Sequence, residues 1–330
     1  MSAPKQRVLT GSRPSGSPHL GNYFGAYKPA IDLQDRYDLF LFLADMHALN
    51  ENYAPAEMRT YSIDMAATFL ACGLDLTKSC FYAQSACPEV AELGWILACQ
   101  TPYGLMLRAH SFKDAQAKGI EVNMGVFDYP ILMAADILMF DPALVPVGKD
   151  QKQHLEMTRD IAMRFNNRYG ETFRLPEPLI SETVGLVPGT DGEKMSKSKG
   201  NVVSVFATDP VWKKQIMAIV TDAKGLADPK DPDTCNVFAL FKLVGSPAEV
   251  QALADKYRAG GYGYGHAKQD LLAKIKETFG PMRERYETLH KSPDELFDRL
   301  QEGARRVRAM AREKLDTVQA KLGLMGRPFR

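Results

Sequence analysis

The stretch that decides the fold is residues 7–23, RVLTGSRPSGSPHLGNY, which predicts a strand, a tight turn and the start of a helix. The pattern predicts a short strand at Arg7–Thr10 that ends at Gly11, and a helix from about Gly21 to Asp35. Glycines in such a turn let the backbone approach a bulky anion without a Cβ clash. A helix start also presents unpaired N–H groups and the positive end of the helix dipole. The stretch therefore predicts a phosphate site.

Three side chains in this turn, Ser15, His19 and Asn22, add hydrogen-bond donors. Together with the backbone they can hold a triphosphate and follow charge as it develops in a transition state. The spacing matches neither G-x-x-x-x-G-K-[ST] nor G-x-G-x-x-G. For His19 alone, an incidental histidine in a plain strand–turn–helix connection is the favoured reading.

A second polar motif lies far downstream, at Lys194–Ser198, KMSKS. The preceding residues 187–192, VPGTDG, are turn-forming, so this loop is expected to move. Two ammonium groups on a mobile loop can close on a triphosphate and neutralise its leaving group. An exposed Lys-Ser loop without function is the alternative.

Strand and helix signals alternate over the first two hundred residues. Apolar runs at residues 39–44, 80–83 and 144–147 predict buried strands, and helical spacing is seen at 55–72, 88–99 and 150–166. We therefore expect an α/β fold with a Rossmann-like, doubly wound parallel sheet and a C-terminal α-helical domain. The expected boundaries are 1–208 for the Rossmann-like domain with the loop 188–204, 209–295 for the helical domain, and 296–330 for a C-terminal helix that packs back on the first domain.

Composition limits the class of protein. The 330 residues are 45% hydrophobic and 25% charged with a net charge of +1, as in an ordinary globular protein. The five cysteines are odd in number and form no CxxC pair, which argues against disulfides and a zinc site. No leader or long apolar stretch is seen, so we expect a cytoplasmic protein without a membrane segment. The basic residues of 299–330 indicate either a nucleic-acid patch or a solvated helix face.

Taken together, the two motifs resemble the paired ATP signatures of class I aminoacyl-tRNA synthetases, known as HIGH and KMSKS. Three further segments resemble bacterial tryptophanyl-tRNA synthetases: Asp45–Leu49 (DMHAL), Tyr129–Leu138 (YPILMAADIL) and Val145–His154 (VPVGKDQKQH). The resemblance runs from Leu9 to about Leu324.

This resemblance implies a role for several residues. The catalytic residues would be His19, Asn22, Lys194 and Lys197. ATP would be bound by Arg13, Pro14, Ser15, Gly21, Asn22, Gly148, Lys149, Asp150, Val187, Lys194, Met195, Ser196, Lys197 and Ser198. Tryptophan would be bound by Asp136, Tyr129, Met133, Gln151, Val145, Leu9 and His47.

Asp136 has a physical argument of its own. Indole has one donor and no acceptor, so a buried carboxylate selects for it, and a Phe side chain would leave that charge unpaired at a cost of a few kcal/mol. On a helix beginning near Pro130, Met133 and Asp136 share a face. Met133 is equally well read as an ordinary core residue. Tyrosine also carries a donor, so a tyrosyl enzyme of the same fold is the nearest alternative.

Three positions depart from the family pattern. Arg13 stands where Gln is frequent, Lys149 where an acid is common, and Ala115 near a phosphate-binding lysine that Lys113 or Lys118 would replace. Some relatives carry an iron–sulfur cluster on four cysteines of the helical domain. Only Cys235 lies there in this chain, so we expect no cluster.

The resemblance implies a two-step reaction. Tryptophan would react with ATP, accompanied by Mg²⁺, to give tryptophanyl-adenylate and pyrophosphate, and then pass to tRNA(Trp). It also implies that the helical domain reads the anticodon, and that the chain forms a homodimer through Val90–Met106 unless that stretch is simply core. A non-translational adenylyltransferase and a catalytically silent binding module are the remaining alternatives.

Overall fold

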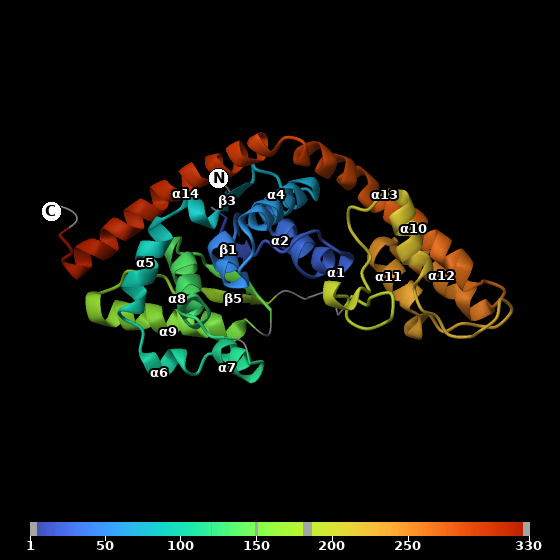
Figure 1. The fold of residues 1–330 in the computed structure, drawn as a ribbon, viewed down its shortest axis with the longest axis horizontal. Helices are drawn as coiled ribbons and strands as arrows, with labels where there is room; N and C mark the ends of the chain where they lie inside the picture. The colour runs from blue at the N-terminus through green and yellow to red at the C-terminus, as the bar shows by residue number, and fades with distance from the viewer. Residues whose placement is uncertain (1–4, 120, 149–150, 181–186, 326–330) are drawn as a thin grey trace.

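The computed structural model describes residues 5–119, 121–148, 151–180 and 187–325 (Figure 1). At its centre is a five-stranded sheet with the order β3-β2-β1-β4-β5, in which every neighbouring pair is parallel. The strands are β1 (Arg7–Ser12), β2 (Asp38–Leu43), β3 (Ser79–Ala83), β4 (Leu144–Val147) and β5 (Glu177–Ile180). This confirms the predicted α/β class with a parallel sheet.

Alternation along β2 explains why helices cover both faces of the sheet. Leu39, Leu41 and Leu43 pack in one apolar cluster with α2 (Lys28–Asp32) and α4 (Pro55–Ala71). Phe40 and Phe42 point the other way. They pack in a cluster with α5 (Glu89–Ala98), α8 (Met124–Met139) and α9 (Lys152–Tyr169).

The helical segment after the first motif combines several helix types. It runs through α1 (Leu20–Asn22), a π-turn at Tyr23–Tyr27, α2, and a 3₁₀ turn at Leu33–Asp35. The predicted end at Asp35 is confirmed. β1 runs two residues further than expected, because Gly11 lets the Phe42 ring lie against it; a Cβ there would meet that ring at 2.3 Å.

The predicted start of one helix was wrong. The helix that carries Asp136 was expected to begin near Pro130, but α8 begins at Met124, where Asn123 caps it by accepting a hydrogen bond from the Val126 N–H at 2.8 Å. Pro130 lies inside α8, although it has no N–H to donate to the preceding turn. Short helices α3 (Asp45–Ala48), α6 (Tyr103–Met106) and α7 (His110–Ala117) complete this part of the chain.

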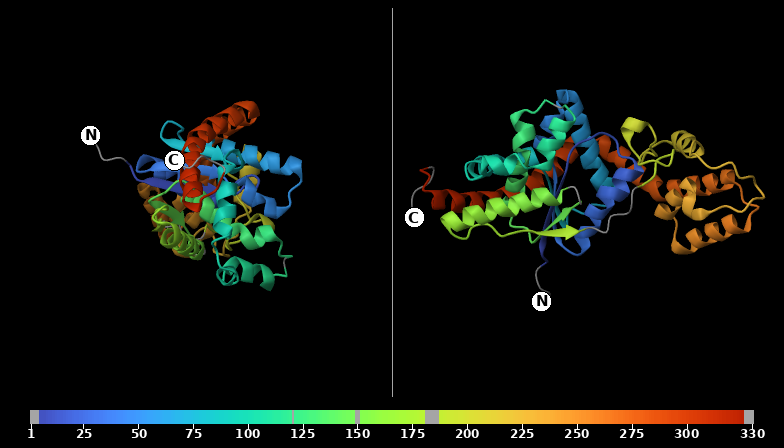
Figure 2. Two further views of the ribbon diagram at one scale, coloured as in Figure 1. Left: turned by 90° about the vertical axis from the view of Figure 1, so that its left-hand side faces the viewer. Right: turned by 90° about the horizontal axis from the view of Figure 1, so that it is seen from below.

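From Asp209 to His290 the described chain is mostly helical and lies to one side of the sheet (Figure 2). The helices from Asp209 onward are α10 (Asp209–Met217), α11 (Asn236–Val244), α12 (Pro247–Ala259), α13 (Tyr264–His290) and α14 (Pro293–Leu322). Polar contacts join α13 to α4. Tyr286 and His290 both bond Asp64 Oδ1, and Arg285 donates to the Ala71 carbonyl at the end of α4.

The last helix, α14, returns over the sheet and lies along β3 (Figure 1). Its basic residues are largely matched by acids: Arg308 bonds Glu89, Arg306 bonds Asp38, and Arg299, Arg305 and Arg312 pair with acids on α14 itself. Of the two readings of this basic segment, the pairing favours a solvated, ion-paired helix face.

Candidate active site

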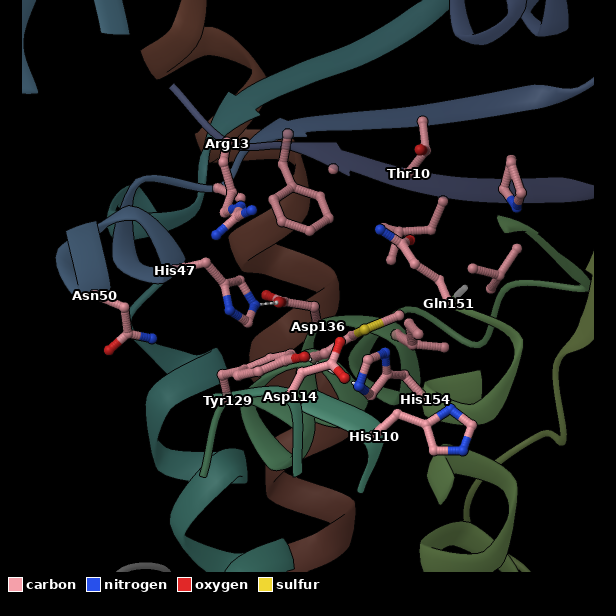
Figure 3. Close-up of a pocket in the computed structure, with 18 residues that line it drawn as sticks. Thr10, Arg13, His47, Asn50, His110, Asp114, Tyr129, Asp136, Gln151 and His154 are labelled. Atoms are coloured by element: carbon pink, nitrogen blue, oxygen red, sulfur yellow. Dashed lines mark hydrogen bonds and ion pairs between the residues drawn. The ribbon is translucent and has the colours of Figure 1, made fainter. Parts of the chain in front are cut away.

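A cavity of about 390 Å³ opens at the carboxyl ends of the central strands (Figure 3). Its walls come from β1, β2, β4, α3, α7, α8 and the start of α9. All seven residues predicted to bind tryptophan line it: Leu9, His47, Tyr129, Met133, Asp136, Val145 and Gln151. Arg13, predicted to bind ATP, lines it as well. The size falls in the usual range of small-molecule sites.

The most deeply buried charge in this cavity is Asp136, whose side chain is 2% exposed. His47 Nε2 lies 3.0 Å from its Oδ2, and Figure 3 shows the two side chains pointing toward each other. Gln84 Nε2 donates to both carboxylate oxygens at 2.9 Å. Burial raises the pKa of Asp136, and the bonds from His47 and Gln84 act against that shift.

Aromatic and imidazole rings form the next part of the wall. The Tyr129 ring lies edge-on to His47 with centroids 6.2 Å apart, and its hydroxyl is 3.0 Å from His154 Nε2. No role was predicted for His154 or Gln84 from the sequence. Gln84 follows a buried strand directly, as the DMHAL segment does, and that position was the available signal.

At the first motif, His19 caps α1. Its Nδ1 accepts from the Asn22 N–H at 3.3 Å, while Asn22 Oδ1 accepts from the His19 N–H at 3.2 Å. Burial, and then the nearby charge of Lys197, lower the pKa of His19 to about 4. The imidazole is therefore neutral at physiological pH, and its Nδ1 is held as an acceptor.

The two motifs contact each other directly. Lys197 Nζ donates to the Ser15 carbonyl, and the Gly21 N–H lies 3.4 Å from Met195 Sδ. Backbone bonds continue this contact, from Leu20 N–H to the Val203 carbonyl at 2.9 Å and from Val205 N–H to the Pro18 carbonyl at 3.0 Å. Partial burial lowers the pKa of Lys197.

The loop with the second motif is organised by Asn201, a buried residue without a predicted role. Its Oδ1 accepts from the Ser196 N–H at 2.8 Å. Its Nδ2 donates to Asp191 Oδ1 at 2.7 Å and to the Lys194 carbonyl at 3.2 Å. Lys194 itself is exposed.

The remaining residues that were predicted to bind ATP differ in their contacts. Arg13 donates to Glu51 Oε1 at 2.8 Å, and the buried Val187 offers its carbonyl to the Met195 N–H at 3.1 Å. The Gly148 carbonyl accepts from the Gln151 N–H at 3.1 Å. Lys149 and Asp150 lie outside the described residues. Ala115 is buried, and its methyl group has no donor for a phosphate.

Within ranges 5–119, 121–148, 151–180 and 187–325, no three or more His, Cys, Asp or Glu side chains are grouped so as to hold a metal ion. Over those same ranges, no helix has the length and apolar character needed to cross a membrane.

The fold and the paired motifs define a class of protein. The family described as tRNA synthetases class I (W and Y) matches residues 1–280. The chain therefore belongs to the class I tRNA synthetases of that family.

Individual relatives specify the branch. The tryptophan–tRNA ligase of Fusobacterium nucleatum is 50% identical over 97% of this chain and 99% of its own, and that of Campylobacter jejuni (strain RM1221) is 47% identical over 96% and 100%. The crystal structure of the Campylobacter jejuni tryptophanyl-tRNA synthetase complexed with ADP and tryptophan superposes with a TM-score of 0.91, at 47% identity, over 96% of this chain and 100% of its own. The chain belongs to the tryptophan–tRNA ligases, and the resemblance seen in its sequence is confirmed.

Proposed function

We propose that this tryptophan–tRNA ligase binds its amino acid in the cavity around Asp136 and its ATP between the two motifs. A carboxylate oxygen of L-tryptophan attacks the α-phosphorus of ATP, a new P–O bond forms, and pyrophosphate leaves. The terminal ribose hydroxyl of tRNA(Trp) then attacks the acyl carbon, and AMP leaves. Such transfers depend on positioning and charge stabilisation, and they need no protein nucleophile.

The observation that carries this proposal is the bond from Lys197 to the Ser15 carbonyl. It supports a nucleotide site bounded by an early turn and a late loop, since Arg13 of the same turn lines the cavity. In this account His19 and Asn22 present donors at the start of α1, while Lys194 and Lys197 neutralise the departing pyrophosphate. Mg²⁺ enters with ATP and is held mainly by phosphate oxygens.

Asp136 recognises the indole of tryptophan, and Gln151 binds the polar end of the amino acid. The buried carboxylate supports this assignment because indole supplies a single N–H donor. The related Campylobacter jejuni structure holds ADP and tryptophan together, which supports the same pair of ligands here.

Two further parts of the proposal concern assembly. The helical domain, 209–295, reads the anticodon of tRNA(Trp), with the ligase acting in the cytoplasm. The chain pairs with a second copy through the α5–α6 face. Trp95 and Tyr103 on this face are 73% and 69% exposed, which supports an apolar contact there.

The test is exchange of labelled pyrophosphate into ATP, measured with each amino acid in turn. Exchange that depends on L-tryptophan alone is expected. Dependence on tyrosine would move the substrate to the tyrosyl branch, and exchange with no amino acid would contradict the proposed activation step.

A further inference from the structure

Asp136 must do two things at once in the proposed function: remain an acceptor while buried, and point one oxygen at the ligand. Its surroundings already supply three hydrogen bonds. His47 donates to Oδ2, and Gln84 donates to Oδ2 and Oδ1. A carboxylate offers about four acceptor positions. Counting the described residues, one position is left, and it lies on Oδ1.

Gln84 is suited to this task by its burial and orientation. Its side chain is 0% exposed, and its Oε1 accepts from the His47 backbone N–H at 3.3 Å. That bond fixes which end of the amide faces Asp136, because a flipped amide would place an oxygen against the carboxylate. The amide nitrogen is always a donor, whereas the single N–H of a neutral imidazole can sit on either ring nitrogen.

The turn that carries Gln84 is itself held in place. Gln84 follows β3 directly, and the next residue, Ser85, bonds Asp45 at the start of α3 through both its backbone N–H and its hydroxyl. Gln84 therefore joins the turn after β3 to α3 on one side and to α8 on the other. Its donor is positioned before any ligand arrives.

We propose that Gln84 is a positioning residue that holds the Asp136 carboxylate with Oδ1 open, and thereby sets the preference for a side chain that bears an N–H donor. This inference rests on the proposed function. It extends that function to a residue that bonds Asp136 and does not line the cavity.

The test compares tryptophan with its benzothiophene analogue, in which sulfur replaces the indole N–H. Gln84→Met keeps the approximate shape and removes the donor. We expect it to raise the KM for tryptophan about 10- to 100-fold, as for loss of a hydrogen bond to a charged group. The KM for ATP should change less than about twofold. The preference for tryptophan over the analogue should shrink, because that preference depends on the N–H bond.

The pH profile gives a second readout. Titratable groups facing Asp136 include His47 and Asp45 on α3 and Tyr82 on β3. Removing the Gln84 donor should raise the pKa of Asp136 further. As the pH is lowered, tryptophan activation by Gln84→Met should therefore begin to fall at a higher pH than activation by the wild type. A smaller amount of folded protein would lower the rate at every pH and would not shift the pH at which activation falls.

Gln34→Met is the matched control. Gln34 is also buried and also bonds backbone groups, Gly73 O and Asp75 N, but it lies outside the cavity lining. It should leave the tryptophan-to-analogue preference unchanged. An unchanged preference in Gln84→Met, or an equal loss in both variants, would overturn the inference. Absence of tryptophan-dependent exchange in the wild type would instead contradict the proposed function.

Discussion

At the residue scale, selectivity in this account depends on one buried carboxylate. Asp136 was predicted from its sequence context, and the structure gives it partners from two other elements, His47 on α3 and Gln84 after β3. Burial alone would favour the neutral acid. The bonds from His47 and Gln84 act against this shift and stabilise the charged form of the acceptor.

Asp136→Ala should lower kcat/KM for tryptophan roughly 100-fold, the scale of a lost hydrogen bond to a charged group. The KM for ATP should stay within about twofold, because the proposed nucleotide site lies elsewhere. Pyrophosphate exchange with each substrate varied in turn measures both. Asp128→Ala on the same helix is the control, since Asp128 does not line the cavity. Equal losses for ATP and tryptophan would mean that the pocket is wrongly assigned.

His19 leads to a prediction about stability and pH. In the unfolded chain its pKa is 6.5, and in the folded chain about 4, so the unfolded state binds more protons between these values. The contribution of His19 to stability is complete above pH 6.5 and is lost as the pH falls toward 4. His19→Asn keeps a good helix cap but not the imidazole. Urea unfolding at pH 7.5 and 5.5 should therefore show a smaller acid loss in His19→Asn than in the wild type or in His266→Asn, and an identical loss would refute this.

Sequence could identify functional side chains more readily than their partners. The residues of the cavity stand in short segments, DMHAL and YPILMAADIL, whose chemistry can be interpreted directly. Gln84 bonds a residue 52 positions away in the sequence. Asn201 bonds residues of its own folded loop. Neither contact could be predicted from residue types alone, because one depends on how two strand ends meet in space and the other on how the loop folds.

At the element scale, the second motif is a shaped loop. Asn201 bonds three of its residues, and a Cβ at Gly189 would meet the Asn201 amide at 2.3 Å, so the loop closes tightly around that side chain.

The position of α8 shows a limit of local patterns at the same scale. Pro130 favours a helix start, yet packing of the apolar α8 face, with the Asn123 cap, extends the helix upstream.

Asn201→Ala should release this loop and lower the kcat of tryptophan activation about tenfold, because Lys194 and Lys197 would no longer be held in place. The KM for tryptophan should change less than about twofold. Lys199→Ala on the same loop, whose Nζ forms an exposed pair with Glu193 at 3.8 Å, is the control and should keep full activity. Wild-type kcat in Asn201→Ala would rule out the organising role.

At the scale of the whole molecule, α14 closes the fold by lying along β3. The approach is close enough that a Cβ at Gly303 would meet the Phe81 carbonyl oxygen at 1.9 Å. Cys80 Sγ also lies 3.5 Å from the Gly303 carbonyl. The amphipathic pattern predicts the helix, but only this glycine explains how it reaches the sheet edge.

Gly303→Ala should therefore destabilise the protein by at least about 2 kcal/mol, since backbone must shift to admit a methyl group. Gly280→Ala in α13 is the matched control: nothing lies within 4 Å of its Cβ position, and it should gain about 0.5–1 kcal/mol from helix propensity. Denaturant unfolding measures both. Equal stabilities of the two variants would contradict the contact described for α14.

Trp95→Ser tests the proposed dimer. If the α5–α6 face joins two copies, removing its largest exposed side chain should give a monomer by light scattering at micromolar concentration. Phe297→Ser on α14, 59% exposed, should leave the mass unchanged. A dimer that survives Trp95→Ser but not Phe297→Ser would place the interface on α14.

The most direct test of the central claim is a crystal structure of this chain with a non-hydrolysable tryptophanyl-adenylate analogue. We predict that the indole nitrogen lies within about 3 Å of Asp136 Oδ1, and that the adenosine lies between the turn at Ser15–Gly21 and the loop at Lys194–Ser198. An indole bound away from Asp136, or an adenosine in contact with neither motif, would contradict it.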